Sequence, residues 1–150
     1  WNLKPETKDL YNLSYHEINV LKKGESINRK GGVVVDPNKC CIAPVKSRSY
    51  VFAADTAFTP KVIDRALNAT LLYHEATFME SEKSIATKTM HSTASDAGRV
   101  ALEANVERLM IGHFSNRYKV LDGLLEEARA VFENTLLANE GETISIGHLD

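Results

Sequence analysis

The amino-acid sequence predicts an α/β (α+β) fold in which helices pack on one mixed sheet. Two observations support this prediction. Apolar runs typical of buried strands occur at 50–55, 69–76 and 106–113, and segments with helical character separate them. From Tyr50 onward the predicted order is β-α-β-α-β-α-β, which favours a sheet covered by helices.

The first 49 residues lack such a regular pattern. Residues 1–14 are predicted to form a loop, and 36–49 to form a connection. HEINVL (16–21) and GGVVVDP (31–37) are candidates for short strands, since β-branched residues recur and glycine or proline ends each run. We therefore expect a single domain over 1–150, with an irregular, hairpin-like lead-in at 1–49 and a regular core at 50–150.

Within the core, each helix has its own signal. Pro60 suits the first turn of a helix at 60–68. A hydroxyl at Ser92 or Thr93, followed by Asp96, predicts a capped start for a helix at 93–104. Leucine and other apolar residues recur at helical spacing over 118–137, which predicts the longest helix. TISI (143–146) is predicted to be the last strand.

The composition indicates a globular protein without a membrane span. The chain has 150 residues, 43% hydrophobic and 25% charged, and no apolar run approaches the ~20 residues that a spanning helix needs. The net charge of −2 does not decide whether nucleic acid is bound, because a phosphate-binding patch is local. The adjacent cysteines Cys40 and Cys41 are expected to be reduced, which favours a cytoplasmic location.

Ionisable residues stand where the predicted strands end. Asp55, the pair His74-Glu75, and His113 each close a strand, and His91 lies in a Ser/Thr-rich loop before a helix. In layered α/β folds such strand ends gather at the active site. Asp and His are ligands of zinc or manganese, whereas His91 has the context of a proton donor or phosphate contact. The alternative is that each is a polar strand-end residue satisfied locally.

Four motifs in this order resemble ribonuclease Z, the tRNA 3′-processing endoribonucleases of the metallo-β-lactamase superfamily. They are AADTAF (53–58), YHEATF (73–78), MHSTASDAGRVA (90–101) and IGHFSNRY (111–118), and LKKGESINRKGGVVVDP (21–37) is similar to the segment before them. The resemblance extends from about Tyr15 to Ile146. It implies the C-terminal half of an αββα sandwich: one mixed sheet with its flanking helices.

The resemblance also implies roles for individual residues. Asp55 would bridge two Zn²⁺ ions, with Mn²⁺ as an alternative, and His113 would be a ligand of the second ion. His91 would protonate the leaving oxygen, and Glu75 would orient it. The implied reaction is removal of 3′ trailers from precursor tRNA through attack by a metal-bound hydroxide. Ala54 stands where the family usually has glycine, a change expected to be tolerated. Further residues of the same motifs are expected to contact the substrate: Ser92, Thr93, Ser115 and Arg117.

Part of the family's site is absent from this sequence. No two histidines are two residues apart, so the HxHxDH metal loop is missing, and the chain begins at Trp1. We expect an inactive fragment of a longer enzyme, whose sheet is covered by the missing segment or by a second copy in a homodimer. Two alternatives remain open: another hydrolase of the superfamily, such as a phosphodiesterase or arylsulfatase-like protein, and a non-catalytic tRNA-binding or assembly module.

Overall fold

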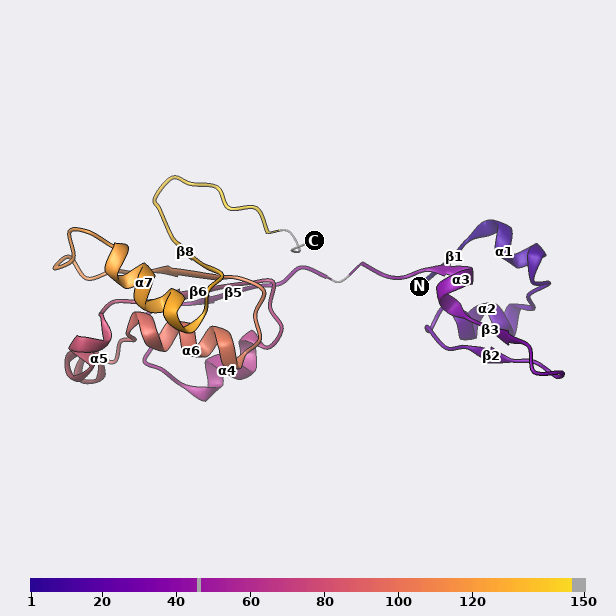
Figure 1. The fold of residues 1–150 in the computed structure, drawn as a ribbon, viewed down its shortest axis with the longest axis horizontal. Helices are drawn as coiled ribbons and strands as arrows, with labels where there is room; N and C mark the ends of the chain where they lie inside the picture. The colour runs from indigo at the N-terminus through magenta and orange to yellow at the C-terminus, as the bar shows by residue number, and fades with distance from the viewer. Residues whose placement is uncertain (46, 147–150) are drawn as a thin grey trace. The chain divides into compact units, whose positions relative to one another are not determined.

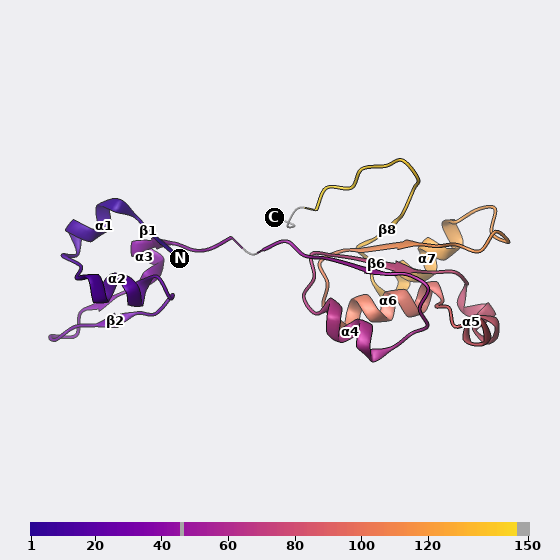
Figure 2. The same cartoon turned by 180° about the vertical axis from the view of Figure 1, so that it is seen from behind.

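The computed structural model describes residues 1–45 and 47–146, and the chain divides into two compact units, 1–47 and 48–150. Figures 1 and 2 show the elements of each unit.

The first unit is a small module of short helices and two-stranded ribbons. Strands β1 (Asn2–Leu3) and β4 (Cys41–Ile42) pair antiparallel, as do β2 (Ile27–Asn28) and β3 (Val34–Val35). Helices α1 (Pro5–Leu10), α2 (Tyr15–Leu21) and α3 (Pro37–Cys40) lie between them. Both cysteines are free and buried. The buried apolar side chains of this module are Leu13, Ile18, Leu21, Val35, Cys40 and Cys41.

Several local predictions for this unit are wrong. HEINVL belongs to helix α2, not to a strand, because Ser14 and Glu17 form a reciprocal capping box that starts a helix at Tyr15. The expected loops at 1–14 and 36–49 contain α1 and α3, which each begin with a proline. Only the second predicted strand is present, as β3.

The second unit has four parallel strands in the order β5-β6-β7-β8. They are β5 (Tyr50–Ala53), β6 (Leu71–Glu75), β7 (Leu109–Gly112) and β8 (Thr135–Leu137). The helices are α4 (Pro60–Ala66), α5 (Lys83–Thr89, after a 3-10 turn at Glu80–Glu82), α6 (Ala94–Glu103) and α7 (Asp122–Val131). This confirms the predicted fold class. The described strands of this sheet are parallel rather than mixed, because every connection contains a helix that returns the chain.

Three element predictions in this unit need correction. β5 is an edge strand with Tyr50 and Phe52 exposed, rather than a buried strand. The last helix ends at Val131, because Phe132 has an extended backbone and Leu136 pairs with β7 instead. Residues 143–146 form no strand, so β8 is the last strand in the described part of the chain.

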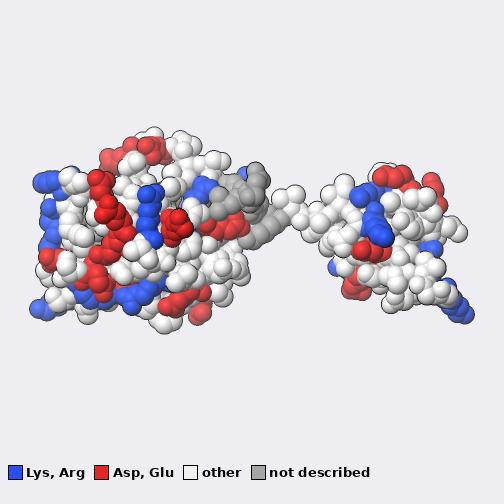
Figure 3. Space-filling model, viewed as in Figure 1, with Lys and Arg blue, Asp and Glu red and all other residues white. Residues whose placement is uncertain are grey.

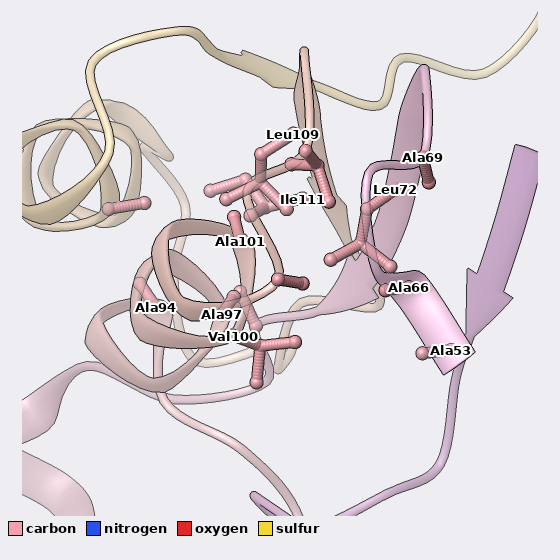
Figure 4. Close-up of a cluster of buried hydrophobic side chains, with 14 of the residues drawn as sticks. Ala53, Ala66, Ala69, Leu72, Ala94, Ala97, Val100, Ala101, Leu109 and Ile111 are labelled. Atoms are coloured by element: carbon pink, nitrogen blue, oxygen red, sulfur yellow. The ribbon is translucent and has the colours of Figure 1, made fainter. Parts of the chain in front are cut away.

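Helix α6 packs closely on the sheet and on α7. Figure 4 shows Ala101 of this helix beside Leu109 and Ile111, and Ala97 and Val100 belong to the same buried cluster. Gly98 faces α7 so closely that a Cβ there would lie 2.9 Å from Val131 Cβ and 3.0 Å from the Ala128 carbonyl oxygen. The main core therefore lies between the sheet and its helices, on one face of the sheet (Figures 1 and 2).

The opposite face of the sheet carries aromatic side chains. Phe52 is 63% exposed and stacks on Tyr73, with 4.6 Å between ring centroids. The segment after β8 meets part of this face, where Ile144 and Ile146 line a pocket with Tyr50. Among the described residues, none of the helices has the length and apolar character to cross a membrane.

Candidate active site

Three strand ends meet at the carboxyl edge of the sheet. Glu75 is the last residue of β6, His113 follows β7, and Asp55 lies two residues beyond β5. Because the strands are parallel and in register, with Glu75 opposite Gly112, their loops leave at the same edge. The structure therefore has the predicted convergence of these three strand ends.

Asp55 and His113 are in direct contact. His113 Nε2 lies 3.2 Å from Asp55 Oδ1, and the two side chains are 42% and 74% exposed. Both residues have left-handed backbones, with φ of 59° for His113 and 48° for Asp55. That conformation costs about 1 kcal/mol for a residue with a Cβ, so the surrounding structure must hold both strand ends in place.

His91 is held by the buried carboxylate of Glu75. Its Nδ1 lies 3.0 Å from Glu75 Oε2, and Glu75 is fully buried. The same carboxylate accepts hydrogen bonds from the N–H of Thr56 (2.5 Å) and of Ser92 (3.1 Å). Burial by itself would raise the pKa of Glu75, but these bonds, with those from the Thr77 hydroxyl and His91, outweigh burial and lower the pKa. Glu75 is therefore a stable anion beside His91.

Thr77 connects the parts of the site, and sequence reasoning did not single it out. Its hydroxyl oxygen lies 2.6 Å from Glu75 Oε2 and 3.0 Å from His113 Nδ1. The same hydroxyl oxygen lies 2.9 Å from the His113 carbonyl oxygen. The sequence signal that could have identified Thr77 is its position in the HEAT motif, two residues after Glu75.

The side chains at this edge fit a divalent cation. One ligand atom each from Asp55, His91 and His113 lies within 4.8 Å of the others. The rings of His91 and His113 are 5.4 Å apart between centroids. A carboxylate with two imidazoles is a donor set suited to zinc or manganese. The grouping includes the two expected ligands, and it also brings in His91, which we had expected to act in proton transfer.

The four residues expected to contact substrate have different environments. Ser92 and Thr93 are fully buried, and their hydroxyls donate to the Thr56 carbonyl (2.7 Å) and to Glu80 (2.6 Å). Thr93 also caps α6. Arg117 is on the surface, 3.0 Å from Glu82 and stacked over the Phe78 ring.

Ser115, the fourth of these residues, is half-buried. Its N–H donates to the Thr77 carbonyl at 3.1 Å, which ties the loop after His113 to the HEAT motif.

His74 lies away from the site, although we had grouped it with Glu75. Adjacent strand residues point to opposite faces, so His74 enters the helical core and is fully buried. Its Nδ1 lies 2.7 Å from the Glu75 carbonyl oxygen, and its Nε2 has no hydrogen-bond partner within the described ranges. Burial lowers the pKa of His74, more than its hydrogen bond and Glu75 raise it.

Comparison with solved structures defines the class of protein. The metallo-β-lactamase fold protein YhfI from Bacillus subtilis superimposes with a TM-score of 0.60 at 31% identity, over 64% of this chain and 39% of that one. The short form of human tRNase Z gives 0.53 at 25% identity, over 76% and 37%. The second unit and its strand-end site thus define part of a metallo-β-lactamase fold.

Sequence comparison then shows which proteins of this class the chain is similar to. Ribonuclease Z of Phocaeicola vulgatus is 41% identical over 145 residues, and that of Porphyromonas gingivalis is 38% identical over 146. Each match covers 97% of this chain. No family model matches. The predicted resemblance to ribonuclease Z is confirmed, and the chain spans about half the length of the curated relatives it matches.

Proposed function

We propose that this chain is part of a metal-dependent endoribonuclease that removes 3′ trailers from tRNA precursors. The observation that carries the proposal is the convergence of Asp55, His91 and His113 within 4.8 Å, with Glu75 paired to His91. The similarity to proteins named Ribonuclease Z supports RNA as the substrate class.

Asp55 and His113 are the proposed metal ligands. Bound divalent ions, two Zn²⁺ in our proposal, would activate water and offset charge on the phosphate. Asp55 supplies a carboxylate and His113 an imidazole Nε2, whose ring is fixed from behind by the Thr77 hydroxyl at Nδ1. Two such ligands are too few for tight binding, so further ligands must come from outside this chain.

His91 and Glu75 are the proposed proton-transfer pair. Glu75 is an anion and can only accept, so the His91 Nδ1–H donates to it and Nε2 is left for the substrate. A proton at Nε2 would be delivered to the ribose oxygen that leaves the cleaved phosphodiester. Ser92 N–H and Thr56 N–H hold the carboxylate, which keeps the pair oriented.

The other proposed site residues divide into two kinds. Arg117 is exposed and can reach RNA phosphate, and Ser115 lies on the same loop. The hydroxyls of Ser92 and Thr93 already have protein partners. We propose that these two act on substrate through the position of the His91 loop.

We further propose that the aromatic face of the sheet is covered in the active protein. Exposed apolar area around Phe52 favours association, either with the remaining half of the fold or with a second copy in a homodimer. The chain by itself should therefore be inactive. Its free cysteines suit a cytoplasmic enzyme.

A second candidate is another hydrolase of the same superfamily, for example a phosphodiesterase. The match to YhfI supports this candidate, because the description of YhfI names the metallo-β-lactamase fold and no RNA substrate. The two candidates differ in their preferred substrate. If the second candidate is correct, a small aryl phosphodiester is cleaved faster than precursor tRNA.

The test joins this chain to the part of the Phocaeicola vulgatus relative that the match leaves out. Loaded with Zn²⁺, this polypeptide should shorten precursor tRNA at the 3′ end, and the chain alone should not. A folded, metal-loaded polypeptide that leaves precursor tRNA intact would refute the proposal, and preferential cleavage of the aryl diester would support the second candidate.

A further inference from the structure

A polar pocket opens beside His91. Its lining includes neither Asp55 nor His113. Phe58, Lys83, Thr87 and Arg99 contribute to its wall, with Glu80 and Asp96. His91 lines the same pocket, so a group bound there lies next to the proposed proton-transfer residue. None of the roles assigned above uses Phe58, Lys83 or Arg99.

Asp96 fixes the two cations of this pocket. Its side chain is only 2% exposed, yet it forms ion pairs with Lys83 Nζ and Arg99 Nη2. It also accepts from the Thr93 N–H, which anchors it at the start of α6. Burial opposes the anion, but the bond from Lys83 and those from Thr93 outweigh it and lower the pKa of Asp96. Both cations therefore have defined positions although their side chains are 40% and 43% exposed.

Arg99 and Phe58 together form one wall of this pocket, with the guanidinium over the aromatic ring. The guanidinium carbon lies 5.3 Å from the centre of the Phe58 ring. The Arg99 side chain pairs with Asp96 through Nη2 and is still 43% exposed, so part of it remains accessible to a ligand. Arginine planes and aromatic rings are the surfaces on which proteins stack nucleobases.

The charge of the lining argues against an isolated phosphate. Lys83 and Arg99 are balanced by Asp96 and Glu80, so the formal sum of the four is zero. A nucleobase is neutral and has both donors and acceptors on its edges, which matches a wall with ammonium, hydroxyl and carboxylate groups. We propose that this pocket receives a nucleobase of the RNA, adjacent to the phosphodiester that is cleaved.

This inference rests on the proposed function for the identity of the ligand, but its test does not require activity. The ¹⁵N-labelled chain is titrated with the four uncharged ribonucleosides and, separately, with inorganic phosphate. Nucleosides should shift the amide signals of Ala57, Phe58 and Thr87, and phosphate should not. An absence of nucleoside shifts up to about 10 mM would overturn the proposal, as would stronger binding of phosphate.

Two variants and a matched control locate the binding. Arg99→Met and Phe58→Leu should each weaken nucleoside binding about tenfold, because stacking on one partner is lost. Arg99→Lys keeps a cation for Asp96 without the plane and should weaken binding similarly. Arg65→Met, at an exposed arginine on α4, should change nothing. The dispersion of the amide signals shows whether each variant folds. Wild-type affinity in folded Arg99→Met and Arg99→Lys would refute the proposal that a nucleobase stacks on Arg99.

The joined polypeptide separates this inference from the proposed function. If it cleaves precursor tRNA and Arg99→Met leaves KM and kcat unchanged, the pocket does not contact substrate. If the nucleoside titration succeeds and no RNA is cleaved, the proposed function fails while the pocket stands.

Discussion

Glu75 holds His91 through a 3.0 Å contact between a fully buried carboxylate and an imidazole nitrogen. The contact joins two elements that are 16 residues apart, the end of β6 and the loop before α6. Because the carboxylate also accepts two backbone N–H groups, it cannot turn away from the histidine without leaving them unpaired. The orientation of His91 is thus a property of the fold.

His91→Ala should remove proton transfer and leave metal retention intact. In the joined polypeptide we expect kcat for precursor tRNA to fall by about 10²–10⁴, with metal content by mass spectrometry at the wild-type value. His16→Ala, at an exposed helix position, serves as control. Loss of an ion in His91→Ala would instead make His91 a ligand, which its place beside Asp55 and His113 allows.

Asp55→Ala should cost the joined polypeptide at least one ion, because it removes the proposed bridging carboxylate. The isolated wild-type chain should retain less than one tightly bound ion, since Asp55 and His113 are its two proposed ligands. Dialysis followed by elemental analysis measures both. An unchanged metal count in Asp55→Ala would refute the bridging role, and stoichiometric zinc in the isolated chain would show a more complete site.

The stability of the chain should fall as the pH drops below about 6.5. His74 is buried and its pKa is lowered from 6.5. Below pH 6.5 the unfolded state therefore binds a proton at His74 more readily than the folded state does. The stabilising effect is complete above that pH and declines toward the lower pKa of the folded state. Urea denaturation at pH 7.5 and 5.5 measures it. His74→Gln should flatten the dependence across this interval, and an equally steep loss in that variant would assign it to other groups.

Gly98→Ala should destabilise the chain, although alanine is normally the better helix former by about 1 kcal/mol. A Cβ at this position overlaps Val131 on α7, and overpacking typically costs about 1–3 kcal/mol. Gly123→Ala is the matched control, because a Cβ there meets only the flexible end of Met79 at 3.4 Å. Thermal unfolding should place the melting temperature of Gly98→Ala below wild type and that of Gly123→Ala at or above it.

The sequence predicts the core of the second unit well because its signals are strong there. The runs that became β6 and β7 are continuous and apolar, and the Thr93-Asp96 cap marks the start of α6. Short segments are harder. HEINVL is compatible with a strand until Ser14 and Glu17 are recognised as a cap, and the apolar spacing at 118–137 runs through two elements. The extended backbone of Phe132 divides them, which periodicity does not reveal.

The candidate site was predictable to the extent that strand ends converge. Asp55, Glu75 and His113 follow from three parallel strands in register. Strand parity, which sends His74 into the core, requires knowing which face the helices cover. The contacts of Thr77 depend on loop geometry that no pattern in the sequence describes.

The left-handed backbones of Asp55 and His113 create a conflict between folding stability and the proposed chemistry. Glycine at either position would adopt the same backbone without steric penalty and would also discard a proposed metal ligand. Selection for thermostability alone should therefore enrich Gly at 55 and 113, whereas selection for turnover should retain Asp and His. A library screened both ways would reveal functional residues of this kind without any knowledge of the substrate.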